Sequence, residues 1–242
     1  MKISAKTDKG MVRSSNQDSY LAGEFQNGVT WAVVCDGMGG ALGGNVASET
    51  AVRIIADKLT AGYHEGMNDN SIKHLIVSAI EAANATVFSK SQSDSSLQGM
   101  GTTVVVGVVN NDTVYLAHVG DSRIYVLSEN SIVQMTTDHS IVQMMVDNGE
   151  ITREEAADHP KKNVITRALG VEDEVRIDYS QEIFNEGDIL LLCSDGLTNY
   201  VNDDNILKIC RENDRYTLAD KLVEAANSNG GGDNVTVVTV SD

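Results

Sequence analysis

Two short apolar runs, each closed by an acid and a glycine, constrain the fold of this chain more than any other feature. The runs are Trp31–Cys35 and Ile189–Cys193, and Asp36 and Asp195 follow them closely. Both runs are rich in strand-forming residues and too short for a buried helix, so each predicts a buried strand. A carboxylate after such a strand is either a helix N-cap or part of a charged site, and Asp36 taken alone fits both interpretations.

The other predicted elements come in groups and do not alternate strictly between strand and helix. Four short strands over residues 102–135 have short connections, which predicts an antiparallel meander. Apolar residues at helical spacing predict helices over 45–59, 71–89, 140–148, 152–157, 203–212 and 217–227. Grouped strands and helices indicate an α+β fold, a four-layer α-β-β-α sandwich of two mainly antiparallel sheets flanked by helices.

Length and composition favour one domain over residues 1–242, with 41% hydrophobic residues and a single proline. The net charge of −17 argues against nucleic acid and anionic membranes as partners, because both attract clustered Lys and Arg. Three cysteines without a CxxC pair indicate a reducing compartment. Since no apolar run is long enough for a membrane span or a signal peptide, we expect a cytoplasmic protein, and we expect a monomer.

Five acids lie at the ends of predicted core strands or in the turns beside them: Asp18, Asp36, Asp121, Asp195 and Asp233. Carboxylates that converge repel one another unless cations lie between them. Oxygen ligands suit Mg²⁺ or Mn²⁺ and do not suit zinc, which prefers His and Cys. The histidines are scattered, and we expect each to be a surface or core residue and not a ligand: His64, His74, His118, His139 and His159.

Other phosphate chemistries lack their motifs, since the chain has no P-loop, dinucleotide fingerprint, cysteine-phosphatase motif or GxSxG elbow. A bridged pair of divalent ions remains, and it lowers the pKa of a shared water so that hydroxide attacks phosphorus in line. Arg13 lies in the same loop as Asp18 and is the candidate to clamp the phosphate oxygens. Arg123 and Arg167 are alternatives, and we expect Arg123 to pair with a nearby acid.

Seven short motifs follow one another across nearly the whole chain. They are RSSNQD (13–18), VCDGMGG (34–40), GTT (101–103), VGDSR (119–123), DHS (138–140), SDGL (194–197) and GDN (232–234). In this order they resemble the metal-dependent Ser/Thr protein phosphatases of the PPM (type 2C) family in their compact bacterial form. The resemblance implies a β-sandwich flanked by helices, with a small flap subdomain at about residues 140–163 that bears on substrate choice.

The resemblance also implies a role for the acids around the first apolar run. Asp36 would bridge two metal ions, and the carbonyl of Gly37 would bind the second of them. Asp195 and Asp233 would complete the first metal site. The implied cofactor is therefore a pair of Mn²⁺ or Mg²⁺ ions.

Three further roles follow from the same resemblance. Asp18 would support the second metal site through water. Asp121, together with Asp195, would hold a third and weaker ion. Arg13 would bind the substrate phosphate.

Two positions depart from the family's pattern. Many eukaryotic members have a histidine directly after the Asp-Gly pair, where this chain has Met38. Many bacterial members have one after the Gly-Gly pair, where this chain has Ala41. The leaving serine oxygen would then take its proton elsewhere, most simply from a metal-bound water.

The predicted function is hydrolysis of phosphoserine and phosphothreonine in proteins, which would reverse Ser/Thr kinase signalling. The implied partners are phosphorylated proteins, including a cognate Ser/Thr kinase and its substrates. Two alternatives stay open. One is a catalytically weak relative that only binds phosphoproteins, and the other is a metal-dependent phosphohydrolase of small molecules.

Overall fold

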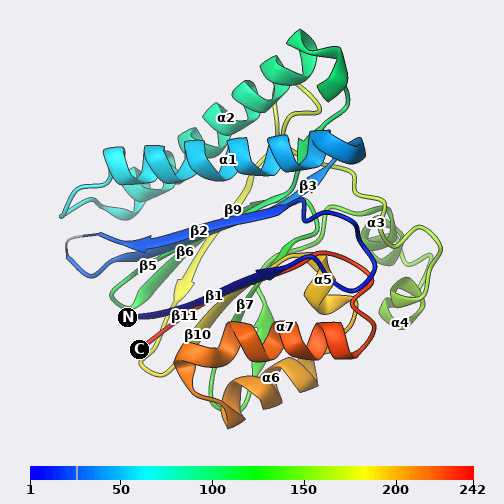
Figure 1. The fold of residues 1–242 in the computed structure, drawn as a ribbon. Coiled ribbons are helices and arrows are strands. Elements are labelled where there is room, and N and C mark those ends of the chain that lie inside the picture. The colour runs from blue at the N-terminus through cyan, green and yellow to red at the C-terminus, as the bar shows by residue number, and fades with distance from the viewer. Residues whose placement is uncertain (26) are drawn as a thin grey trace.

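The fold is a sandwich of two antiparallel sheets, seen in a computed structural model that describes residues 1–25 and 27–242, with the backbone alone at Ala41 (Figure 1). The first sheet has the order β1 (Lys2–Asp8), β11 (Val235–Ser241), β10 (Ile189–Cys193), β7 (Arg123–Leu127) and β8 (Ile132–Gln134). The second has the order β2 (Asp18–Glu24), β3 (Thr30–Met38), β5 (Val104–Asn110), β6 (Thr113–Val119) and β9 (Asp178–Ile183). The short β4 (Gly101–Thr102) pairs with β3.

Helices cover both outer faces of the sandwich (Figure 1). The second sheet is covered by α1 (Gly40–Gly62) and α2 (Asp69–Ser93), and the first by α5 (Asp195–Thr198), α6 (Asp203–Glu212) and α7 (Leu218–Ser228). The short helices α3 (Ile141–Asp147) and α4 (Arg153–Ala157) lie at one end, and single 3₁₀ turns occupy Ser95–Leu97 and Arg215–Thr217. The four-layer prediction is confirmed. None of the helices in the described chain has the length and apolar content that crossing a bilayer requires.

Apolar side chains pack in three layers, one between the sheets and one under each group of helices. On β3, Trp31 and Val33 pack toward α1 and α2, whereas Ala32 and Val34 pack between the sheets. Because strand side chains alternate, a strand buried on both faces is apolar throughout, which explains the uninterrupted run. Asp36 continues the alternation of Ala32 and Val34, so its carboxylate points into the space between the sheets.

The structure corrects the local predictions in three places. The meander is wrong in its middle, because β6 and β7 belong to different sheets and the chain crosses between them at Gly120, whose φ is +108°. Asp36 is no helix cap, since it lies inside β3 and α1 begins at Gly40, before the predicted start at residue 45. The edge strand β9 and the short helix α5 have no counterpart among the predicted elements.

Candidate active site

The structure brings the predicted acids together at one edge of the sandwich. Asp18 on β2 lies directly opposite Asp36 on β3 in the strand register. Asp195 is the first residue of α5 and is separated from β10 by Ser194 alone, while Asp233 precedes β11 and Asp121 lies in the crossing between β6 and β7. Burial, followed by the charges of the other four acids, holds the pKa of Asp36 well above its usual range. The five carboxylates therefore form one electrostatic cluster.

Burial and neighbouring negative charges also raise the pKa values of Asp18, Asp121 and Asp195. Burial raises the pKa of Asp18 to about 7, even though a hydrogen bond from Ser194 opposes the rise. Burial, with the charge of Asp195, also raises the pKa of Asp121 to about 7. For Asp195 the pKa is raised by burial and by the charge of Asp233. In each case the charged carboxylate is disfavoured where it lies, and a cation placed among these groups would offset both the burial and the mutual repulsion.

Asp18 provides the most direct test of whether cations fit. Its Oδ2 accepts a hydrogen bond of 2.7 Å from Ser194 Oγ, but in the described part of the chain its Oδ1 is buried without any hydrogen-bond partner. A buried carboxylate oxygen that lacks a partner is costly, and a nearby cation removes that cost. The side chains of the cluster offer only oxygen atoms, which is the donor set of Mg²⁺ or Mn²⁺. The residues present therefore fit divalent cations.

Two threonines hold the backbone of Asp36 in place. The N–H of Asp36 donates to Thr103 Oγ1 at 2.9 Å, and its carbonyl accepts from the Thr103 N–H at 2.8 Å and from Thr102 Oγ1 at 2.9 Å. The next residue must be glycine, because a Cβ at Gly37 would collide with the carbonyl oxygens of Gly44 and Gln17. The end of β3 is thus fixed before any ligand arrives.

Arg13 reaches the cluster from the N-terminal loop. Its Nη2 lies 2.8 Å from Oδ2 of Asp233, and this hydrogen bond with the accompanying charge raises the pKa of Arg13. The side chain remains 54% exposed, and a guanidinium has five N–H donors. Arg13 can therefore stay on Asp233 and still offer donors to an anion at the cluster.

A residue that sequence reasoning gave no role, Asn234, anchors the loop that carries Arg13. Its Oδ1 accepts the N–H of Gln17 at 2.9 Å, and its Nδ2 donates to the carbonyls of Lys9 at 2.9 Å and Ser15 at 2.8 Å. One buried amide thus ties both ends of the loop to the residue that follows Asp233. Its place in the GDN motif was the only signal in the sequence.

Replacing Asn234 with alanine should raise KM for a phosphopeptide and lower kcat/KM roughly 10-fold, as is usual for the loss of a supporting partner. The change removes three hydrogen bonds and frees the loop that positions Arg13. Steady-state kinetics would measure the effect. Asn229→Ala is the matched control, because that exposed amide also donates to a carbonyl, of Tyr200, at 2.9 Å. Wild-type KM in the Asn234 variant would show that the loop needs no such anchor.

The two alternative arginines have structural partners. Arg123 makes a paired contact with Asp138, with Nε 3.0 Å from Oδ1 and Nη2 2.7 Å from Oδ2, so the expected ion pair is confirmed. Arg167 Nη1 lies 2.9 Å from Oδ1 of Asp178. Neither arrangement leaves these guanidinium groups as free as that of Arg13.

The two positions where relatives have a histidine carry no other proton-donating side chain, since they are Met38 and Ala41. Met38 ends β3, and its terminal methyl packs against Gly101, where an added Cβ would come within 2.8 Å of it. The side chain of Ala41 lies outside the part that the structure describes. Two histidines are core residues, since His118 and His139 are buried and stacked with 4.6 Å between ring centroids.

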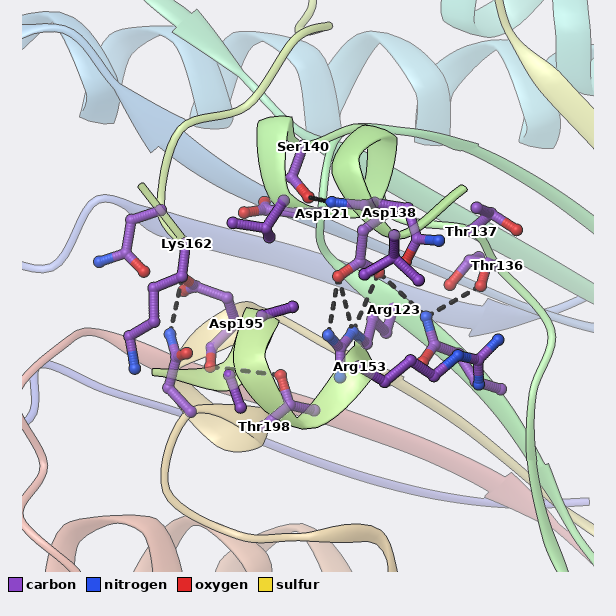
Figure 2. Close-up of a pocket in the computed structure, with 18 of the residues that line it drawn as sticks. Asp121, Arg123, Thr136, Thr137, Asp138, Ser140, Arg153, Lys162, Asp195 and Thr198 are labelled. Carbon is purple, nitrogen blue, oxygen red and sulfur yellow. Dashed lines mark hydrogen bonds and ion pairs between the residues drawn. The ribbon is translucent and has the colours of Figure 1, made fainter. Parts of the chain in front are cut away.

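A cavity of about 550 Å³ adjoins the cluster (Figure 2). Asp121 and Asp195 lie on its wall, and so do Thr198 and Asp203 from α5 and α6. The remaining wall includes residues of α3, α4 and the chain that follows them, within residues 140–163, which we call the flap segment. The cavity therefore lies between the flap segment on one side and helices α5 and α6 on the other, directly beside Asp121 and Asp195.

Comparisons with known proteins agree with this geometry. The chain matches the protein phosphatase 2C family over residues 11–225. The serine/threonine phosphatase stp of Listeria monocytogenes is 39% identical over an alignment of 240 residues, and the match covers 97% of this chain and 93% of that protein. The S. agalactiae serine/threonine phosphatase superimposes with a TM-score of 0.92 at 36% identity, covering 100% of this chain and 99% of that one.

A further structure relates the fold to metal ions. The catalytic domain of the serine threonine protein phosphatase PstP, solved in complex with two manganese ions, has a TM-score of 0.86 and 35% identity, and the match covers 100% of this chain and 98% of that one. The family match spans most of the chain, and these relatives agree along nearly their full length. The chain therefore belongs to the protein phosphatase 2C family and is a protein phosphatase.

Proposed function

We propose that this enzyme removes phosphate from phosphoserine and phosphothreonine in proteins, with Mn²⁺ or Mg²⁺ held by its acid cluster. The observation that carries the proposal is the convergence of Asp18 and Asp36 with the other acids around a buried oxygen that has no hydrogen-bond partner in the described chain. The manganese ions in the related PstP structure support the choice of metal.

The proposed ligands divide into two groups. Asp36 would be shared by two ions, with the Gly37 carbonyl, Asp195 and Asp233 completing their sites, and Asp18 acting through water. Asp121, together with Asp195, would hold a third and weaker ion. Divalent cations bound there would neutralise charge on the phosphate and provide an activated water for hydrolysis.

The chain's own side chains perform the remaining tasks. Arg13 would bind the phosphate oxygens through its planar fork of donors while Asp233 holds it in position. Thr102 and Thr103 keep Asp36 fixed during turnover. Neither Met38 nor Ala41 can donate a proton, so the proton for the leaving serine oxygen comes from water.

The cavity beside the cluster suits a protein substrate, because its volume of about 550 Å³ and its polar wall can receive residues that flank the phosphorylated one. The flap segment would then influence which flanking residues are accepted. We further propose a monomer of one domain that works in the cytoplasm and opposes a cognate Ser/Thr kinase by acting on that kinase and its substrates.

Hydrolysis of p-nitrophenyl phosphate should require added Mn²⁺ or Mg²⁺ and should fall to background with excess EDTA, since without cations the site has no activated water and nothing to offset the charge of its acids. A phosphothreonine peptide should be turned over with a higher kcat/KM than sugar phosphates or nucleotides. Activity that survives chelation would overturn the role of metal ions. Metal binding without turnover of any of these substrates would favour a phosphoprotein-binding module, and a preference for small substrates would favour a phosphohydrolase of metabolites.

A further inference from the structure

The tripeptide Asp138-His139-Ser140 joins the acid cluster to the flap segment. Asp138 holds Arg123, two residues after Asp121, through the paired contact described above and seen in Figure 2. Ser140 Oγ accepts the N–H of Gln143 at 3.2 Å and so caps α3, the first helix of the flap segment. His139 lies between these two anchors.

His139 makes two hydrogen bonds to Gly120, the residue before Asp121. The backbone N–H of His139 donates to the carbonyl of Gly120 at 2.9 Å, and the ring Nδ1 of His139 accepts the backbone N–H of Gly120 at 3.0 Å. A backbone N–H can only donate, so Nδ1 carries no proton. Gly120 has a positive φ of +108°, and a Cβ there would lie 2.6 Å from Thr103. The imidazole therefore stabilises a backbone conformation that fixes where the next residue, Asp121, is placed.

The far side of the ring is held by an ion pair. With Nδ1 accepting, the proton of the neutral ring is on Nε2, which donates to Oδ2 of Asp178 at 3.2 Å. Arg167 Nη1 donates to the other oxygen of Asp178 at 2.9 Å and lies 3.0 Å from Nε2, so both donors serve the same carboxylate. Burial, with the adjacent His118, lowers the pKa of His139 to about 4, in agreement with a neutral ring.

The same group of side chains could be mistaken for a metal site, since one ligand atom each of His118, His139 and Asp178 lie within 4.8 Å of one another. However, His118 Nε2 donates to the carbonyl of Thr137 at 2.9 Å, and both ring nitrogens of His139 already have partners. A cation at Nε2 of His139 would also lie against the guanidinium of Arg167. The contacts therefore indicate orientation of the ring and not ligation.

His139 also bonds to the chain at the end of the flap segment. The carbonyl of His139 accepts the N–H of Thr166 at 2.7 Å, where the chain returns from the flap segment. The next residue, Ser140, forms a β-bridge with Ile165. The start and the end of the flap segment thus meet at His139, directly behind the turn that carries Asp121.

We propose that His139 is a positioning residue that couples the flap segment to Asp121 through the Gly120 turn. Cation binding at Asp121 and the order of the flap segment then depend on one imidazole. The inference rests on the proposed function, in which Asp121 holds the weaker cation. It also assigns a role to Asp178 and Arg167, which keep the ring in the tautomer that accepts from Gly120.

Two substitutions at His139 separate the two sides of the ring. In His139→Asn the amide oxygen can replace Nδ1 and keep the acceptor for Gly120, whereas His139→Gln places its amide toward Asp178 and loses that acceptor. In calorimetric Mn²⁺ titrations, His139→Gln should weaken the low-affinity site roughly 10-fold or more, as expected for a lost supporting partner, and leave the tighter sites unchanged. His139→Asn should retain most of the wild-type affinity, and the exposed His74→Ala should match wild type.

Two readouts need no metal. In the metal-free protein, the amide proton of Gly120 should exchange faster in His139→Gln than in His139→Asn. Trypsin should likewise cleave the flap segment, which contains Arg153, Lys161 and Lys162, faster in His139→Gln. Because both variants keep a polar side chain of similar size, neither depends on the fold surviving a large cavity.

The outcomes separate this inference from the proposed function. If Asp121→Ala leaves Mn²⁺ binding unchanged, Asp121 is not a ligand and that part of the proposed function fails. If Asp121→Ala removes the weak site but the Gln and Asn variants at His139 bind Mn²⁺ equally and are cleaved equally, the coupling is overturned and the proposed function stands. Weak-site loss with faster flap cleavage in the Gln variant alone supports the coupling.

Discussion

Replacing Asp36 with asparagine should lower kcat on a phosphothreonine peptide by on the order of 10³-fold, the upper range for loss of one preorganised electrostatic group. Asparagine keeps the shape of the side chain and removes the charge that two cations would share. The fold should survive, because Thr102 and Thr103 bond to the backbone of Asp36 and not to its carboxylate. Kinetics at saturating Mn²⁺, with a thermal melt of the same sample, would measure both effects.

The control for this prediction is the same chemical change on the surface. Asp57 is exposed on α1, so Asp57→Asn should leave kcat and the melting temperature as in wild type. A folded Asp36→Asn enzyme that turns over at close to the wild-type rate would remove Asp36 from the active site. A loss of activity that higher Mn²⁺ restores would show instead that Asp36 contributes only affinity for metal.

Much of the fold could be predicted from the sequence because the central strands of both sheets are buried on both faces. Such strands are apolar throughout, and β10 is found with the expected bounds, as is the helix α6 with its regular apolar spacing. The edge strand β9 could not be predicted, because it is half-exposed and lacks a clear alternation. The crossing at Gly120 was also hidden, since a glycine turn between two strands looks the same whether the chain forms a hairpin or changes sheet.

In the site, too, some residues could be predicted from their local sequence and others could not. The acids could be found because each lies at the end of a core strand, and strand ends of a sandwich meet at its edge. The supporting side chains could not, because their partners are backbone atoms far away in the sequence. Asn234 accepts a hydrogen bond from Gln17, which is 217 positions away in the sequence, and Thr103 accepts one from Asp36, which is 67 positions away. Such contacts leave no periodic pattern, so only the folded structure shows what Asn234 and Thr103 do.

In the presence of a chelator, the buried acids should make the protein less stable as pH rises from about 4 to about 7, and they outweigh the opposite contribution of His139, whose pKa is lowered to about 4. The pKa of Asp18 is raised by burial from 3.8 to about 7 in the folded state, so between these values the folded protein binds the proton more tightly than the unfolded chain. Stability falls with pH wherever the folded state holds more protons. Asp121 titrates in the same direction. A tenfold difference in proton affinity between the two states corresponds to about 1.4 kcal/mol, so denaturant melts at several pH values should detect the trend.

Asp18→Asn isolates the cause of this trend. Asparagine stays neutral and its oxygen can still accept from Ser194 Oγ, so at pH 8 with chelator the variant should unfold at a higher denaturant concentration than wild type. Excess Mn²⁺ should reverse the order, because the cation binds the folded wild-type cluster more tightly than the cluster that lacks the Asp18 charge, and so stabilises the wild type more by mass action. If the variant is less stable than wild type in chelator, the buried carboxylate of Asp18 is not the strained group that the structure indicates, and another acid of the cluster carries the repulsion.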